Sequence, residues 1–332
     1  MNEFYQFYQE TIRNTLRPLE AERRSAALKY QQIKLIQIAM FVAFVVLTLV
    51  YLFGGISFVK FFIIAIILTY LCLMFSKKGK KLAKEYTNNI KYQILKKALL
   101  KWGKFEISKL KISSLAENSL KIAAASTPKS HNLKLISKKH LIGRTDVGEL
   151  DFILAENIIK NDNKKDNTPE LSLKEKVVSF IENFDQRIED KKIRYIMAVA
   201  FYVDNNAPQT RVFLLPKDQN SQICKYYNDV KKVKIKNLNF NEKYDVWTNN
   251  PQTAEKGTCN LFFDSLADDQ QIYLGNLSAM IEGNKGVVCL EMMYDVCYFG
   301  VNDEIDNGGK FADIANIAES LIDIVSRIKK SF

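Results

Sequence analysis

The residues that could perform chemistry are few and scattered along the chain. There are two histidines, His131 and His140, and five cysteines, none of which form a Cys-x-x-Cys pair. Because the spacing of a zinc site is missing, we predict no metal and no cofactor. Both histidines lie in lysine-rich surroundings with no serine or cysteine partner that spacing identifies, so we expect them at the surface. We interpret the cysteines as small buried hydrophobic residues.

The acidic and glycine-containing segments do not complete a catalytic or ligand motif. Asn302, Glu304 and Asp306 alternate like the start of a calcium loop, but the glycine follows one place late, at Gly308. The chain also lacks a P-loop, a Gly-x-Ser-x-Gly elbow and a His-Glu-x-x-His pair. We therefore name no catalytic residue, although an enzyme assembled from distant segments stays open.

Two strongly apolar runs dominate the first quarter of the chain. They cover residues 35–53 and 56–75, and as helices each is long enough to cross a hydrocarbon layer of ~30 Å. Gly54 and Gly55, which separate them, are poor helix formers, and glycine can adopt the positive φ that a reversal needs. We predict a transmembrane helical hairpin over residues 35–75 that turns at these two glycines.

Basic residues flank both apolar runs. Residues 76–111 contain twelve lysines and two glutamates, so they carry most of the chain's net charge of +11. The five lysines nearest to the second run are Lys77, Lys78, Lys80, Lys81 and Lys84. We therefore expect a two-span protein of the cell inner membrane. By the positive-inside rule, both of its termini should lie in the cytoplasm. We expect these five lysines to face anionic headgroups, and we expect no nucleic-acid partner, because aromatic residues are not interleaved for stacking.

Small residues recur at similar depths in the two apolar runs. They are Ala39 and Ala43 in the first run and Ala65 and Thr69 in the second. Small side chains let helix backbones approach closely in a membrane. We expect them to pack the two helices of the hairpin against each other, and a seam between copies of the chain is the alternative.

Periodicity predicts the remaining organisation. Residues 1–34 read as a cytoplasmic amphipathic helix and residues 76–111 as a basic juxtamembrane helix. Residues 112–332 read as a cytoplasmic α+β domain, because β-branched and aromatic runs separated by turn signals predict an antiparallel sheet with packed helices. A flexible linker is expected near 161–169, where the sequence NDNKKDNTP has almost no apolar residue. The predicted fold class is an α+β membrane protein.

Three segments resemble the bacterial membrane proteins of the domain of unknown function 3137 family. They are FYQETIRNTLRPLEAERR (7–24), HLIGRTDVGELDFILAE (140–156) and AVAFYVDNNAPQTRVFLLPKD (198–218). The likeness consists of packing and turn motifs spread over most of the chain. It implies a two-span membrane protein with a cytoplasmic domain and no established activity, so it assigns no role to any residue.

These patterns favour a non-enzymatic module anchored in the inner membrane, which binds a protein partner or assembles into a homo-oligomer. One alternative is a membrane-bound enzyme or small-ligand sensor with a cleft on the sheet, and another is a pore or transport accessory built from oligomerised hairpins. A pocket with converging polar groups would favour the enzyme or sensor. A ring with a wetted axis would favour the pore, and a flat apolar patch on the domain would favour the binding module.

Overall fold

The computed structural model describes residues 6–108, 133–135, 139–160, 191–203, 210–217, 227–235, 238–252, 275–292, 295–305 and 308–331. The linker predicted near 161–169 lies outside the described residues, as do His131 and Asp306. The chain divides into two compact units. The first comprises Met1–Ala98 with Cys297–Ala312, and the second comprises Leu99–Val296 with Asp313–Phe332.

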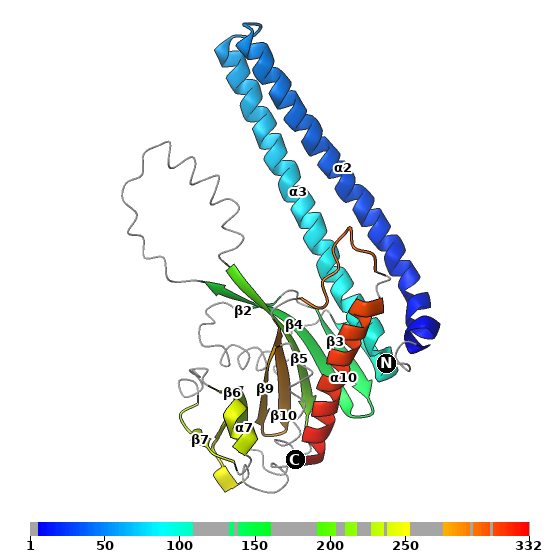
Figure 1. Ribbon diagram of the computed structural model, residues 1–332, viewed down its shortest axis with the longest axis vertical. Helices are drawn as coiled ribbons and strands as arrows, with labels where there is room; N and C mark the ends of the chain where they lie inside the picture. The colour runs from blue at the N-terminus through cyan, green and yellow to red at the C-terminus, as the bar shows by residue number, and fades with distance from the viewer. Residues whose placement is uncertain are drawn as a thin grey trace. The chain divides into compact units, whose positions relative to one another are not determined.

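Two long antiparallel helices joined by a tight turn form most of the first unit (Figure 1). A short π-helical segment, η1 (Tyr8–Ile12), leads into α2 (Arg13–Leu52), and α3 (Phe58–Ala98) runs back along α2. The amphipathic segment predicted for residues 1–34 is therefore not a separate element, because its helix continues without a break into the first apolar run. Both helices are long and apolar enough to cross a membrane.

The chain reverses at Gly54 and Gly55. Gly54 has a φ of +77°, in the left-handed region that residues with a Cβ rarely adopt, and its N–H donates to the Tyr51 carbonyl. The Gly55 N–H donates to the Val50 carbonyl over 2.9 Å, and a Cβ at Gly55 would lie only 3.0 Å from Val50 Cγ1. Across the turn the Tyr51 and Phe61 rings stack with their centroids 4.5 Å apart. Backbone conformation at Gly54 and lack of space at Gly55 thus explain why two glycines occur here.

A seam of buried and half-buried side chains joins the two helices. Its members recur at steps of three, four or seven residues, which is the spacing of a left-handed coiled coil. On α2 they are Tyr30, Ile33, Gln37, Met40, Leu47 and Tyr51, and on α3 they are Phe61, Ala65, Leu68, Cys72, Phe75, Gly79, Leu82 and Tyr86. The seam extends beyond the apolar runs, so one packing pattern holds the whole hairpin together.

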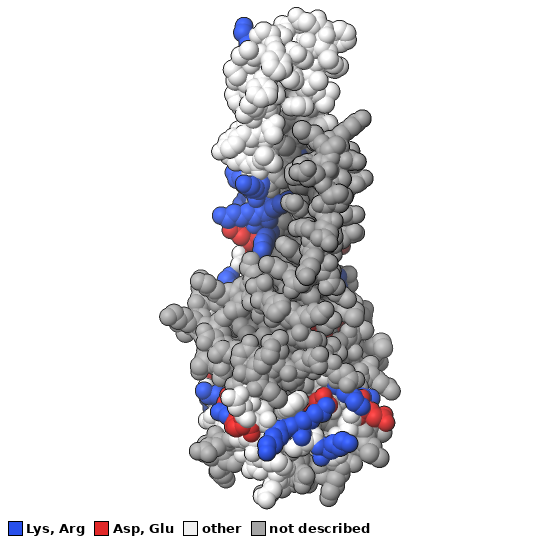
Figure 2. All heavy atoms as spheres, turned by 90° about the vertical axis from the view of Figure 1, so that its left-hand side faces the viewer, with Lys and Arg blue, Asp and Glu red and all other residues white. Residues whose placement is uncertain are grey.

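The outward side of the hairpin is apolar near the turn and charged farther from it. Large apolar side chains are exposed all around the end that carries the turn, and Leu35 is 65 % and Phe53 86 % exposed. Figure 2 shows this end as an almost uncharged surface, with Lys and Arg side chains gathered where it stops. We call the exposed apolar residues between Leu35 and Met74 the apolar sleeve.

The second unit is built around one antiparallel sheet, as the sequence predicted, and the α+β class is confirmed. Its strand order is β1-β3-β4-β5-β10-β9-β6-β8-β7, and the short β2 pairs with β4. The strands are β1 (Gly103–Ser108), β2 (Leu133–Leu135), β3 (His140–Thr145), β4 (Gly148–Lys160), β5 (Lys191–Tyr202), β6 (Arg211–Pro216), β7 (Lys231–Val233), β8 (Tyr244–Thr248), β9 (Gly275–Glu282) and β10 (Lys285–Met292). The helical elements are η2 (Leu99–Lys101), α7 (Leu238–Lys243) and α10 (Gly308–Ser331), of which α10 enters this unit at Asp313.

The basic helix predicted for residues 76–111 ends earlier than expected. α3 stops at Ala98, and residues 103–108 form the edge strand β1, which pairs with β3. Gly103 explains the difference, because a Cβ at this position would overlap the backbone carbonyl of Arg144 on β3. The glycine allows the close approach of the two strands, and this long-range contact overrides the helical pattern of the lysine-rich segment.

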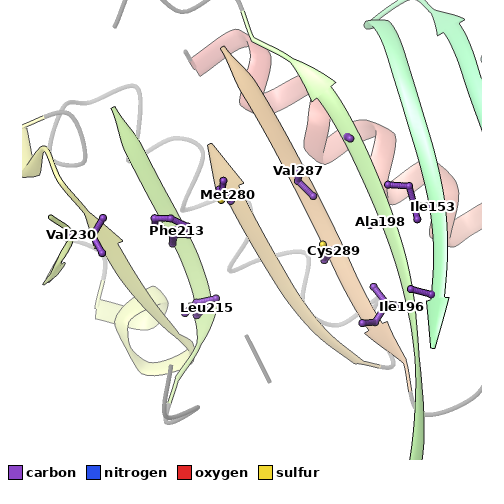
Figure 3. Packing of buried hydrophobic residues seen from close by; sticks show 11 residues of the cluster. Ile153, Ile196, Ala198, Phe213, Leu215, Val230, Met280, Val287 and Cys289 are labelled. Atoms are coloured by element: carbon purple, nitrogen blue, oxygen red, sulfur yellow. The ribbon is translucent and has the colours of Figure 1, made fainter. Parts of the chain in front are cut away.

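One face of the sheet carries a core cluster that reaches from β4 to β6. Antiparallel register places Ile153 beside Ala198, and Ala198 beside Cys289, so neighbouring strands present their side chains in rows. Figure 3 shows this cluster in front of the sheet and α10 behind it. Side chains alternate between the faces along a strand, so Asp151 lies on the same face as Ile153.

Candidate functional sites

The five predicted headgroup lysines occupy successive turns of α3 just after its apolar part. Lys77, Lys78, Lys80, Lys81 and Lys84 are all exposed. Lys81 has a loose ion pair with Glu85, with 3.8 Å between Nζ and Oε1. Exposed ion pairs of this kind are weak, so the cluster keeps most of its positive charge available for anions.

The four small residues of the hairpin do not all lie at the contact between the two helices. Ala65 is half-buried on the seam between the helices, whereas Ala39, Ala43 and Thr69 are exposed on the outward side. The structure therefore differs from the prediction at three of the four positions. The physical reason is the period of the seam. It places Met40 at the contact between the helices, and its neighbour Ala39 points away from that contact.

A charged network at the start of α2 holds the segment after β10 in the first unit. Glu20 accepts hydrogen bonds from Arg23, at 2.6 and 2.8 Å, and from the backbone N–H of Ile305 at 3.4 Å. Arg23 also donates to the Val301 carbonyl over 3.2 Å. The hydrogen bonds from Arg23, with a contribution from Arg24, lower the pKa of the Glu20 carboxyl to about 2. The network joins residues almost 300 positions apart in the sequence.

His140 is buried, which contradicts the surface position expected from the sequence. Its side chain is 2 % exposed, and its Nδ1 lies 2.6 Å from Oδ1 of Asp151, which is also buried. An ionised carboxylate can only accept a hydrogen bond, so Nδ1 carries the proton and donates a hydrogen bond to Asp151. Nδ1–H bound to a carboxylate fixes the ring orientation and leaves Nε2 with a lone pair when the histidine is neutral.

The second ring nitrogen of His140 has no hydrogen-bond partner. Nε2 is buried, and among the described residues no donor or acceptor reaches it. Most buried polar side-chain atoms in proteins have a partner, so an unpaired Nε2 requires an explanation. A basic nitrogen oriented by a carboxylate and left without a partner is the arrangement of a general base or a ligand-binding group.

Ser108 stands directly opposite His140 on the neighbouring strand. The two residues are Cα partners in the β1–β3 ladder, and Asp151 is the partner of Ile142 in the β3–β4 ladder. Directly paired residues have Cβ atoms about 4.5–5.5 Å apart on one face of a sheet. Ser108, His140 and Asp151 therefore lie next to each other on the sheet face that carries the core cluster.

A groove opens at the same edge of the sheet. It has a volume of about 560 Å³, and Ser108 contributes to its lining while His140 does not. The other lining residues are Lys104, Glu106, Ile107, Ile142, Gly143, Arg144 and Glu149. Ser108 is half-buried and lines the groove, and its cross-strand partner His140 is buried.

The other candidate residues carry no comparable arrangement. Cys289 is buried in the core cluster, where burial raises the pKa of its thiol to about 12, and Cys297 is buried as well. In the calcium-like segment, Asp303 accepts a hydrogen bond from the Gly300 N–H over 2.8 Å, which makes a turn. In the part of the chain that the structure describes, no three His, Cys, Asp or Glu side chains gather as metal ligands would.

Sequence reasoning missed the His140–Asp151 pair because the strand register brings the two residues together. They are separated by eleven positions, across the turn between β3 and β4. The available signal was the hairpin HLIGRTDVGELDF, in which Asp146 to Gly148 mark a turn and place His140 diagonally opposite Asp151. Comparison of the chain with protein-family models, with curated proteins and with solved structures gave no match.

Proposed function

We propose that the chain is a two-span membrane protein in which the hairpin of α2 and α3 anchors the sheet at a membrane surface. The apolar sleeve supports this proposal most directly, because it exposes large apolar side chains around both helices. Transfer of one such side chain out of water contributes about 1.5–3 kcal/mol, so a sleeve of this size strongly favours a lipid environment. The resemblance to the domain of unknown function 3137 family agrees with this organisation.

The charges beside the sleeve support an orientation. The exposed lysines from Lys77 to Lys84 follow the apolar part of α3, and Lys29 and Lys34 precede that of α2. The positive-inside rule then places both ends of the hairpin, and the sheet, in the cytoplasm, with anionic headgroups as the adjoining lipids.

At the membrane surface we propose a binding or scaffold role, through a protein partner or through self-assembly. The outward position of Ala39, Ala43 and Thr69 supports self-assembly, because small residues on the lipid-facing side of a helix allow another helix to pack closely. Such a contact would join hairpins of neighbouring copies within the bilayer.

Membrane anchoring is tested by fractionating cells that express the full chain. We expect the protein in the membrane fraction after alkaline carbonate washing, and reporter tags on both termini in the cytoplasm. Recovery in the soluble fraction, or tags on opposite sides of the membrane, would overturn the anchor.

Self-assembly is tested by replacing Ala39 and Ala43 together with isoleucine. We expect the mass of the purified particle to fall to that of one chain, because the larger side chains separate the helices. Isoleucine at Val42 and Val46, which are exposed on the same helix, is the matched control and should leave the mass unchanged. A wild-type chain that is already monomeric would exclude self-assembly and leave a separate protein as the partner.

A membrane-bound enzyme is the second candidate. The observation that favours it is the buried His140–Asp151 pair with an unpartnered Nε2 beside a groove. Structural histidines in a core normally satisfy both ring nitrogens, so this pair points to chemistry at the β1 edge of the sheet.

A further inference from the structure

We propose that Ser108, His140 and Asp151 form a nucleophilic triad that hydrolyses a carboxylic ester bound in the groove at the β1 edge. This inference rests on the second candidate function. It does not depend on the hairpin spanning a membrane.

Three adjacent strands supply the three groups in the order that acyl transfer requires. Asp151 of β4 accepts a hydrogen bond from the Nδ1–H group of His140, which orients the ring on β3. Ser108 of β1 is the cross-strand partner of His140. A serine, a histidine and a carboxylate can work as nucleophile, general base and orienting group on unrelated folds, and here the strand register brings all three to one face of adjacent strands.

The burial of the three side chains follows the same order. Asp151 and His140 are buried, whereas Ser108 is half-buried and lines the groove. A substrate in the groove would therefore meet the serine hydroxyl first, and the imidazole behind it would be shielded from water. The cross-strand pairing places the Cβ atoms of Ser108 and His140 about 4.5–5.5 Å apart, and catalytic hydrogen bonds that are long in a free site commonly tighten when substrate binds.

The groove indicates a small, polar ester as the substrate. Two positive and two negative side chains line it, Lys104 and Arg144 against Glu106 and Glu149, so it has no excess of either charge. Ile142 and Ile107 give it a limited apolar surface. An open groove of mixed charge fits a short acyl chain better than a long one.

The reaction balances with water as the second substrate. Ser108 Oγ attacks the ester carbonyl while its proton passes to His140 Nε2, and the alcohol leaves with that proton as the acyl–serine forms. Water then attacks the acyl carbon, gives a proton to Nε2, and releases the acid while Ser108 recovers its hydrogen. The net change is ester and water to acid and alcohol, with His140 and Asp151 unchanged.

The direct test is covalent labelling of the full chain in detergent with a fluorophosphonate, followed by mass spectrometry of the labelled peptide. We expect the label on Ser108, its loss in Ser108→Ala, and its retention in Ser326→Ala, a half-buried serine of α10 that serves as the control. Absence of label on Ser108 in wild-type protein that retains its cooperative thermal melt would overturn the triad.

A second measurement addresses the positioning role of Asp151. Asp151→Asn should lower kcat for p-nitrophenyl acetate hydrolysis at least tenfold with little change in KM, and it should alter the pH profile of the rate. Equal rates and pH profiles for the two proteins would exclude the triad. Membrane fractionation of the same variants separates the two proposals, because loss of the triad leaves the anchor intact.

Discussion

Gly79 of α3 packs against Ile33 of α2, and a Cβ at position 79 would lie 3.2 Å from Ile33 Cγ2. Both residues belong to the seam, on the lysine-bearing side of the apolar sleeve. The glycine therefore sets how closely the helices approach outside the apolar runs.

Substitution at Gly79 tests this packing. Gly79→Leu should destabilise the hairpin by about 1–3 kcal/mol, because the side chain has no room on the seam. Gly79→Ala should change stability little, because a slight shift of the Ile33 methyl group accommodates one carbon and alanine favours the helix. Thermal melting of the detergent-purified chain compares the two variants, and equal melting temperatures would contradict the close contact.

The Glu20–Arg23 network should stabilise the first unit in a pH-dependent way. The pKa of Glu20 is lowered from 4.5 to about 2 by the hydrogen bonds from Arg23, so the ionised carboxylate favours the folded state. This contribution is complete above pH 4.5 and disappears as the pH falls toward 2.

Glu20→Gln should therefore lower stability near pH 7 by at most about 3 kcal/mol, and the difference from wild type should shrink on acidification. Glu22→Gln, an exposed neighbour on the same helix, is the control. A difference between Glu20→Gln and wild type that persists unchanged down to pH 2 would show that the carboxylate charge is not the cause.

The lysine cluster after α3's apolar part should select anionic lipid. Each lysine near a charged surface contributes about 1 kcal/mol, so changing Lys77, Lys78, Lys80, Lys81 and Lys84 to glutamine should reduce co-purified anionic lipid several-fold. Native mass spectrometry of the purified protein measures the lipid. Glutamine at Lys104, Lys231 and Lys232, which are exposed on the sheet, is the control and should leave the lipid content unchanged.

Cys289 should resist alkylation in the folded protein. Burial raises the pKa of its thiol to about 12, so almost no thiolate exists at pH 8 and the sulfur is shielded. Iodoacetamide with site-resolved mass spectrometry should find Cys289 unmodified until denaturant is added. Rapid modification without denaturant would mean that the sheet opens at β10.

The parts of the fold that depend on local composition could be predicted from the sequence. The apolar runs and the Gly54–Gly55 reversal follow from residue type alone, because chain length, polarity and backbone freedom act within a few residues. The antiparallel sheet followed from turn signals between β-branched runs.

The parts that depend on register could not be predicted in the same way. Ser108 and His140 become neighbours only when β1 pairs with β3, and nothing near either residue indicates that pairing. The outward position of Ala39 and Ala43 depends on the phase of the seam, which a shift of one residue reverses. The strand at residues 103–108 depends on a contact between Gly103 and Arg144 that local helix propensity cannot represent.

The uninterrupted course of α2 has a mechanical consequence. At 1.5 Å per residue its 40 residues extend about 60 Å, roughly twice what a bilayer core requires. In the proposed two-span arrangement, about half of α2 would therefore continue out of the hydrocarbon layer as one unbroken helix. The contacts of Glu20 and Arg23 with the segment after β10 would then lie outside the lipid, held to the spanning part of α2 by the helix itself.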